Sequence, residues 1–207
     1  MLENPQMLLL ILPILIFSIV IHEMAHGYAA LFQGDPTAKN MGRLSLNPLV
    51  HLDPIWSVLV PTVTMIAGGF FFGMAKPVLY NPNNLRNKKW GESIVAVAGP
   101  ISNIVIALIF VGILKVMFAF GYADTMVLQG MFLVVVMNLF LAIFNMIPVP
   151  PLDGSKILFD FLGQKHRFIR QWLEKYALFL LVGLLLLLLN TQFMSYFVLY
   201  LATLLVG

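Results

Sequence analysis

The residues of this chain best suited to chemistry are two histidines and a glutamate near its start. The segment His22-Glu23-Met24-Ala25-His26 places two imidazoles four residues apart, on one face of a helix and about one turn from each other. Glu23 projects about 100° around that helix from His22, where it can accept a proton from a metal-activated water without being a ligand. The pattern indicates a metal-dependent hydrolase; its alternative is a chance match in a buried helix.

A catalytic zinc site needs a third protein donor and one open position. The chain has no cysteine, so the donor must be a histidine or a carboxylate; the candidates are His51, His166, Asp53, Asp124, Asp153 and Asp160. Asp153 is favoured because the prolines of residues 145–154, NMIPVPPLDG, break a helix at the end of a long apolar stretch. Irregular backbone at membrane depth is tolerated where it lines a polar cavity. Taken alone, Asp153 also fits a turn or a helix cap.

The composition is that of a membrane protein. Of the 207 residues, 60% are hydrophobic and 10% charged, and the mean hydropathy is +0.94, whereas soluble domains carry about 25% charge. We predict five spanning helices, at residues 7–33, 93–119, 127–147, 176–190 and 193–206. The first stretch lacks a basic leader and a cleavage site, so it is expected to be retained. The net charge of +3 lies in loops beside apolar segments, so we expect no nucleic-acid partner.

Three motifs follow one another along the chain: His22-Glu23-x-x-His26, then Gly99-Pro100-x-x-Asn103, then Asn145-x-x-Pro148-x-x-x-Leu152-Asp153-Gly154. Together they resemble the site-2 protease family of intramembrane zinc metalloproteases, in its small bacterial or archaeal type without an attached regulatory domain. Their order and spacing extend the resemblance over nearly the whole chain.

The resemblance implies one zinc ion per chain, bound by His22, His26 and Asp153, with Glu23 as general base and acid. It also implies that Asn145 helps to hold or polarise the scissile carbonyl, for which the alternative is a hydrogen bond that packs helices. An amide donor there could stabilise a developing oxyanion. Asn103, in contrast, is expected to pack helices.

The sidedness of the membrane follows from the site. If His26 and Asp153 bind one ion, the ends of their two spans must face the same side. A full crossing by residues 55–74 would place them on opposite sides, so we predict that this segment is re-entrant. The prediction puts 11 of the 12 Lys and Arg residues on one side, which should be the cytoplasm. The N-terminus is then outside, and the zinc lies towards the cytoplasmic face of a plasma or inner membrane.

The expected fold is a single all-α membrane domain over residues 1–207, with short β-strands near the cytoplasmic face. Residues 42–47 and 74–80 carry strand-like patterns; such strands could hold an extended substrate by strand addition or form a surface hairpin. Residues 163–175 are expected to lie along the membrane interface. His166 there is expected to be solvated or lipid-facing, and His51 and Asp53 to form a structural turn, with substrate contacts or inhibitory ligands as their alternatives.

The function that these features favour is hydrolysis of peptide bonds in or near the membrane segments of protein substrates. Besides substrate and bilayer, a regulatory membrane protein or a second copy of the chain is a candidate partner. The alternative is a divalent metal transporter that uses the His, Glu and Asp cluster as an ion site. It is less favoured because four histidines offer few ligands along a path. An inactive membrane scaffold is disfavoured because the whole inferred site is present.

Overall fold

The computed structural model describes residues 5–59, 62–63, 76–163 and 166–207. Three long helices dominate these ranges: α1 (Pro5–Phe32), α4 (Gly91–Ala119) and α5 (Thr125–Asn145). Four shorter ones follow, α6 (Gly154–Leu162), α7 (Arg167–Lys175), α8 (Ala177–Thr191) and α9 (Phe193–Val206). Between α1 and α4 lie the short helix α2 (Thr37–Asn40) and the turns η1 (Pro48–His51), η2 (Pro54–Leu59) and η3 (Pro82–Asn84). The prediction of an all-helical fold is confirmed.

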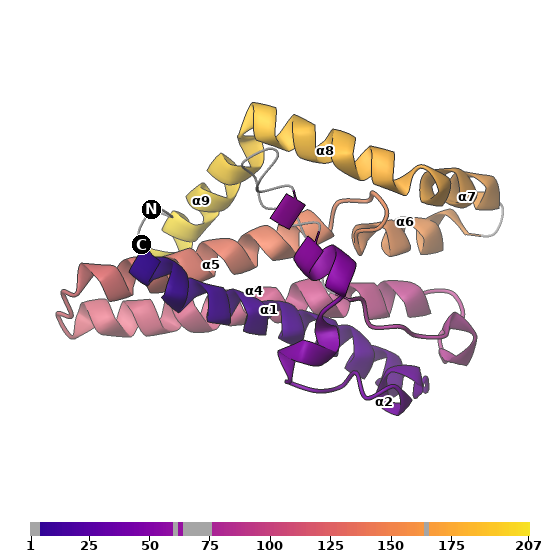
Figure 1. Ribbon diagram of the computed structural model, residues 1–207, viewed down its shortest axis with the longest axis horizontal. Coiled ribbons are helices and arrows are strands. Elements are labelled where there is room, and N and C mark those ends of the chain that lie inside the picture. Colours follow the sequence, from indigo (N-terminus) through magenta and orange to yellow (C-terminus); the bar gives the residue numbers. More distant parts are fainter. Residues whose placement is uncertain (1–4, 60–61, 64–75, 164–165) are drawn as a thin grey trace.

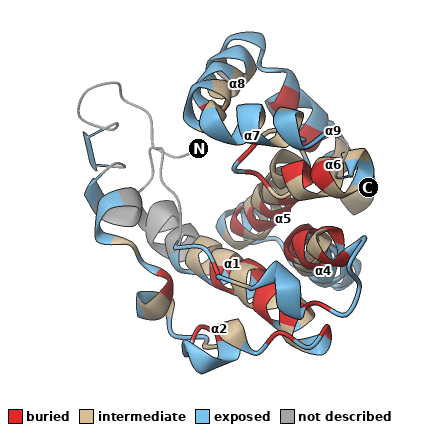
Figure 2. Cartoon of the chain, turned by 90° about the vertical axis from the view of Figure 1, so that its right-hand side faces the viewer, coloured by how far each residue is buried: buried red, intermediate tan, exposed pale blue. Residues whose placement is uncertain are grey.

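Helices α1, α4 and α5 pack side by side as a bundle (Figure 1), with their buried faces turned towards one another (Figure 2). Asp124 begins α5 by accepting hydrogen bonds from the backbone N–H groups of Met126 and Val127, which would otherwise lack partners. The main apolar core joins α4, α5 and α9, and its buried members are Ala107, Val111, Leu114, Val135, Leu139, Met194, Val198 and Ala202. At the other end of the bundle, Gln33 Nε2 donates to the carbonyl oxygen of Gly91 at 3.1 Å. The end of α1 and the start of α4 therefore lie together.

Fewer helices can span a membrane than the sequence predicted. Three are long and apolar enough among the described residues, or four if α7 and α8, which meet at 69°, form one bent span. Helix α8 has 15 residues and α9 has 14, so each is about 21 to 23 Å long, short of a hydrocarbon core of about 30 Å. Their predicted boundaries are nearly those observed, but five full spans are not confirmed.

The predicted β-strands are absent from the described residues. At 42–47 the chain turns and bends, because side chains take the carbonyl groups that a ladder would need: Arg43 donates to the backbone oxygen of Val50, and His51 Nε2 lies 2.9 Å from the backbone oxygen of Ser45. Residues 76–80 do not pair with a neighbouring strand among the described residues. The backbone N–H of Val78 donates instead to the Glu23 side chain of α1. Most of the predicted re-entrant segment, residues 60–61 and 64–74, lies outside the described residues.

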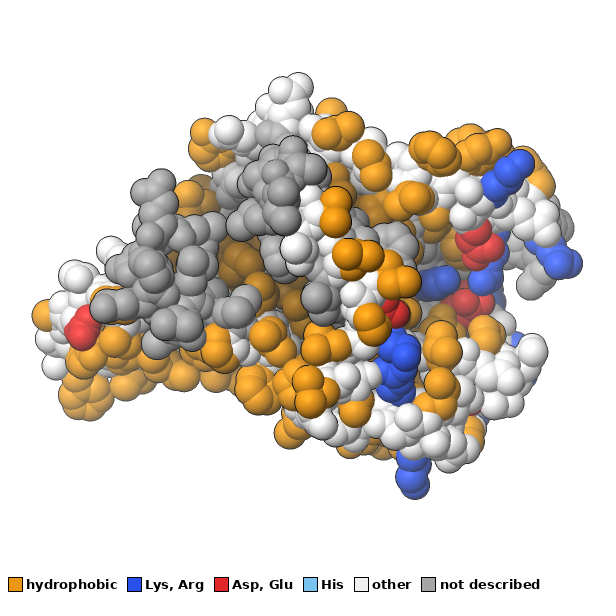
Figure 3. All heavy atoms as spheres, in the orientation of Figure 1, with side chains coloured by type: hydrophobic (Ala, Val, Ile, Leu, Met, Phe, Trp, Pro, Cys, Tyr) orange, Lys and Arg blue, Asp and Glu red, His pale blue; other side chains and the backbone are white. Residues whose placement is uncertain are grey.

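Lys and Arg side chains lie towards one end of the molecule, and hydrophobic side chains cover much of the described surface elsewhere, with one acidic side chain at the opposite end (Figure 3). Helix α7 lies at the end with the Lys and Arg side chains and meets α8 at the bend. Its Phe168 and Trp172 are 69% and 54% exposed, and its basic residues alternate with them. An exposed helix with large apolar and basic side chains is typical of a membrane interface.

Candidate metal centre

Helix α1 presents both histidines of the first motif to the interior of the bundle. His22 and His26 are 7% and 8% exposed, and their Nε2 atoms are 3.1 Å apart. They lie on the same face because four residues make slightly more than one helical turn. Glu23 is half-buried on the same helix. The spacing seen in the sequence has therefore brought the two imidazoles to a common point.

Asp153 reaches that point from the far end of the chain. Its Oδ2 lies 3.2 Å from His22 Nε2 and 3.3 Å from His26 Nε2. The chain turns sharply between the end of α5 and the start of α6, and Gly154 lies so close to the turn that a Cβ there would be 2.7 Å from the backbone oxygen of Ile147. A side chain at this glycine would therefore push the turn open.

Helix α4 supports the histidines from behind. The carbonyl oxygen of Val95 lies 2.8 Å from His26 Nδ1, and since a carbonyl can only accept, the proton is on Nδ1. The lone pair of Nε2 then faces Asp153, which is how histidine ligands are usually oriented for a metal. One turn further along α4, Gly99 allows very close packing, because a Cβ there would lie 2.5 Å from His26 Cε1 and 2.6 Å from His22 Nε2.

The three side chains fit a small tetrahedral cation. Ligand atoms around zinc, at bond lengths of about 2.0 to 2.1 Å, are separated by about 3.3 Å, and the three separations here are 3.1, 3.2 and 3.3 Å. Two neutral imidazoles and an ionised carboxylate are donors that zinc accepts. Among the described residues, His22, His26 and Asp153 form the group of His and acidic side chains whose donor atoms lie close enough together to hold a metal ion.

Comparison with known proteins places the chain in a family. It is 37% identical over 168 residues to the protein named "Putative zinc metalloprotease YwhC" of Bacillus subtilis, covering 79% of this chain and 74% of that protein. This chain belongs to peptidase family M50. The model of the family matches residues 121–189, a region that includes Asn145 and Asp153 but not the two histidines. The predicted resemblance to the site-2 proteases is thereby confirmed.

Other relatives of this M50 peptidase are more distant or match over shorter stretches. Rip2 of Mycolicibacterium smegmatis, described in the same words as YwhC, is 28% identical over 139 residues, which cover 67% of this chain and 52% of Rip2. MJ0611 of Methanocaldococcus jannaschii, again described in these words, is 44% identical over 64 residues, or 31% of each chain. No solved structure matches the chain significantly.

The glutamate of the motif has a partner that the sequence did not reveal. Oε2 of Glu23 accepts a hydrogen bond of 2.9 Å from the backbone N–H of Val78. Residues 76–86 run along the C-terminal half of α1, and we call them the strap. Val78 is buried against α1, where a Cβ on Gly27 would come within 3.2 Å of it. The M50 peptidase thus holds its motif glutamate by a backbone group of the strap.

Asp35 fastens the strap to the end of α1. It is fully buried, and its carboxylate accepts from the backbone N–H of Asn81 at 2.7 Å, from Asn84 Nδ2 at 2.8 Å and from the Thr37 hydroxyl at 2.6 Å. Burial disfavours its charged form, but these hydrogen bonds outweigh burial and lower the pKa of Asp35. Asp35 was not singled out from the sequence. A carboxylate between Gly34 and Pro36 was the signal available.

The other singled-out residues take structural positions in the M50 peptidase. Asn145 Nδ2 donates to the carbonyl oxygen of Leu141 in its own helix at 2.9 Å. Asn103 of α4 is fully buried, and neither its Nδ2 nor its Oδ1 has a hydrogen-bond partner among the described residues. His51 is buried and bonds to Ser45, as expected for a structural turn. Asp53 accepts from the N–H of Ile55, and the exposed His166 bonds to Leu162 of α6. His51, Asp53 and His166 lie outside the group of side chains that meets at Asp153.

Proposed function

We propose that this M50 peptidase is a zinc-dependent endopeptidase that hydrolyses peptide bonds in or near transmembrane segments of other proteins. The observation that carries the proposal is the convergence of His22, His26 and Asp153, whose donor atoms lie 3.1 to 3.3 Å apart. Family membership supports the peptidase activity. The helices α1, α4 and α5, which are long and apolar enough to span a membrane, support a substrate that is itself in the membrane.

In this proposal His22, His26 and Asp153 bind one zinc ion, with Val95 and Gly99 of α4 fixing the imidazoles from behind. A zinc ion held there supplies Lewis-acid polarisation of the scissile carbonyl and lowers the pKa of water towards about 7. The protein's part is to keep two neutral imidazoles and one carboxylate in place. The hydrogen bond from His26 Nδ1 to Val95 secures the required tautomer.

Glu23 is the general base and general acid in this proposal. Its carboxylate takes the proton of the attacking water and later delivers it to the nitrogen of the leaving amine, so that the residue ends as it began. The hydrogen bond from Val78 reaches only Oε2, which leaves Oε1 to take the proton. The same hydrogen bond ties the carboxylate to the backbone of the strap.

Asn145 is proposed to donate to the carbonyl oxygen of the scissile bond. One N–H of its amide is used within α5, in the bond to Leu141. The amide has a second N–H, so the residue can keep its position on the helix and still offer a donor to the substrate. A neutral donor aimed at developing negative charge is a recognised source of rate enhancement.

The proposed orientation of the protein in the membrane rests on one contact between α1 and α4. The bond between Gln33 and Gly91 places the end of α1 and the start of α4 at the same end of the bundle, which supports a chain that makes no net crossing between them. This agrees with a re-entrant segment at residues 55–74. The basic residues near this end make it the cytoplasmic side, so the N-terminus lies outside and the site faces inward.

The transporter alternative receives no support from the described residues, because they contain one candidate metal group and no second one along a path. One experiment distinguishes a peptidase from a transporter. Purified protein is incubated in detergent with a panel of labelled single-span substrates, with zinc content measured in parallel and Glu23→Gln as the comparison. The proposal expects the variant to keep its zinc and lose cleavage. Zinc in both proteins without cleavage of any substrate would favour transport.

A further inference from the structure

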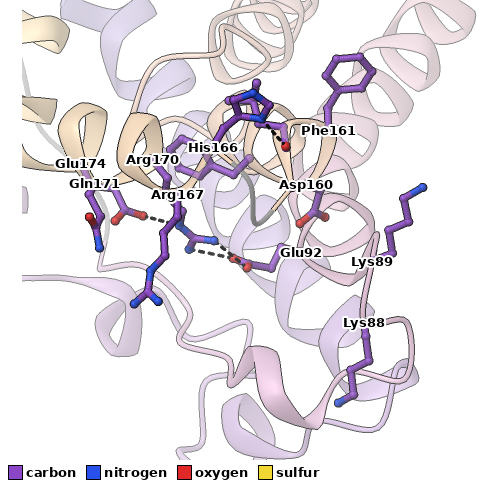
Figure 4. Close-up of a pocket in the computed structure, with 13 residues that line it drawn as sticks. Lys88, Lys89, Glu92, Asp160, Phe161, His166, Arg167, Arg170, Gln171 and Glu174 are labelled. Atoms are coloured by element: carbon purple, nitrogen blue, oxygen red, sulfur yellow. Dashed lines mark hydrogen bonds and ion pairs between the residues drawn. The ribbon is translucent and has the colours of Figure 1, made fainter.

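A cavity of about 700 Å³ opens at the charged end of the molecule. Its walls come from the loop before α4, the C-terminal end of α6 and helix α7 (Figure 4). It lies apart from the metal centre, and neither His22, His26 nor Asp153 lines it. Charged and polar side chains from all three walls border the opening.

The acidic side chains of the cavity are already engaged. Arg170 donates to Glu92 at 3.1 Å and to Glu174 at 3.0 Å. Asp160 Oδ2 accepts from both the backbone N–H and the hydroxyl of Ser93, each at 2.8 Å, and so caps the first turn of α4. Glu92 and Glu174 thus share the one guanidinium of Arg170, and Asp160 lies at the positive end of α4.

Three cations of the cavity have no acidic partner. None of the ion pairs in the described part of the chain includes Lys88, Lys89 or Arg167. Lys88 Nζ donates to the backbone oxygen of Asn83, and Lys89 lies over the ring of Trp90 at 5.0 Å. The lining has four Lys and Arg side chains and three carboxylates, so with His166 neutral the cavity carries a net charge of +1.

Large apolar side chains are exposed beside these cations. Phe161 at the end of α6 is 76% exposed, and Phe168 and Trp172 of α7 are 69% and 54% exposed. Figure 4 shows Phe161 directed away from the polar groups. Such side chains are expected to contact hydrocarbon in a membrane protein. Phe161 lines the cavity, whereas Phe168 and Trp172 lie on α7 outside its lining. Cationic and exposed apolar side chains therefore lie close together at this end of the molecule.

We propose that this cavity binds the headgroup of an anionic phospholipid, with Lys88, Lys89 and Arg167 holding the phosphate and the acyl chains lying along Phe161 and α7. A binding site for a soluble anion would need the same cations but not the exposed aromatic rim. Basic pockets beside membrane helices are suited to anionic headgroups.

The position of the cavity connects it to the metal centre. Helix α6 leads from Asp153 to Asp160, and Asp160 bonds to Ser93, which is two residues before Val95, the partner of His26. The lipid site and the metal centre thus share α6 and the start of α4. On the proposed peptidase function, we therefore expect the bound lipid to change cleavage rates as well; lipid binding itself does not depend on that function.

The test measures lipid binding directly. The full chain, purified in neutral detergent, is titrated with phosphatidylglycerol or phosphatidylcholine, and bound lipid is counted by native mass spectrometry. The test variant is Lys88→Gln/Lys89→Gln/Arg167→Gln. The control is Lys39→Gln/Lys76→Gln/Arg86→Gln, which removes the same charge from exposed residues outside the cavity. Circular dichroism verifies that both variants are folded.

We expect phosphatidylglycerol to bind more tightly than phosphatidylcholine, and the cavity variant to lose roughly tenfold to hundredfold in affinity for it while the control loses less than about threefold. Equal losses in the two variants would show a diffuse attraction and overturn the site. Absence of any preference for phosphatidylglycerol in the unmodified chain would do the same. Displacement of phosphatidylglycerol by millimolar inorganic phosphate would assign the cavity to a soluble anion instead.

Discussion

The backbone N–H of Val78 donates a hydrogen bond of 2.9 Å to Oε2 of Glu23, across 55 positions of sequence. A hydrogen bond to a charged group typically contributes about 1.5 to 3 kcal/mol. Backbone groups cannot change rotamer, so this contact holds the carboxylate more firmly than a side chain would. The strap is thus part of what positions the general base in the proposed mechanism.

Removal of this N–H should slow the reaction while leaving the metal in place. We expect Val78→Pro, which has no N–H, to lower kcat by roughly tenfold to a hundredfold, with zinc content unchanged. Val78→Ala keeps the N–H and is the matched control. The cleavage rate of a single-span substrate and the zinc content are measured on the same preparations of both variants. Equal cleavage rates in the two variants would rule out a positioning role for the Val78 N–H.

Loss of one metal donor should release the ion. We expect Asp153→Ala to weaken zinc binding by more than about a hundredfold, since even the loss of a group that merely orients a ligand costs tenfold to a hundredfold. Asp124→Ala removes a carboxylate that caps α5 and should retain zinc. Competition with a fluorescent chelator gives both affinities. Full retention of zinc by the Asp153 variant would contradict the proposed ligand set.

A methyl group on Gly99 should disturb the metal centre. Its Cβ would lie 2.5 to 2.6 Å from atoms of His26 and His22, and overpacking of this kind costs about 1 to 3 kcal/mol. We expect Gly99→Ala to lower both the melting temperature and zinc affinity. On the same helix, a Cβ on Gly112 meets nothing within 4 Å, so Gly112→Ala should be neutral or stabilising by up to about 1 kcal/mol. Similar behaviour of the two variants would argue against close packing at the histidines.

Asp35 should make the fold sensitive to acid. Its pKa is lower in the folded protein than its ordinary value, so its stabilising contribution is complete above an unfolded pKa of about 3.9 and is lost as the pH falls through the folded value. We expect the melting temperature of the unmodified chain to fall more steeply below about pH 4 than that of Asp35→Asn. Asp124→Asn should follow the unmodified chain. Parallel curves for the chain and its Asp35 variant would remove Asp35 from this role.

The sequence was sufficient to predict the meeting of His22, His26 and Asp153. Helical spacing places the two histidines together, and the resemblance to a family pointed to Asp153 from a distant turn. Contacts that depend on the path of a loop could not be predicted from helical spacing or from the resemblance. No local pattern shows that the N–H of Val78 meets Glu23, or that Asp35 is buried beneath the strap.

The strand predictions were wrong for a related reason. Alternation at residues 42–47 is a local property, whereas a strand needs a neighbour to pair with. Arg43 and His51 instead bond to backbone carbonyl groups within the same loop. The strap is held by side chains of α1 and of the turn after it instead of by a second strand. Glu23 and Asp35 accept the N–H groups of Val78 and Asn81. Tertiary contacts of this kind override a local preference for extended structure.

The distance in sequence between the donors also bears on how the protein is made. His26 and Asp153 are separated by nearly two thirds of the chain, and synthesis proceeds from the N-terminus at about 5 to 20 residues per second. During that interval α1 carries two imidazoles and a carboxylate base without the third donor. On the proposed ligand set, an activity that needs all three donors begins only after α4 and α5 have been made and the turn after α5 has emerged.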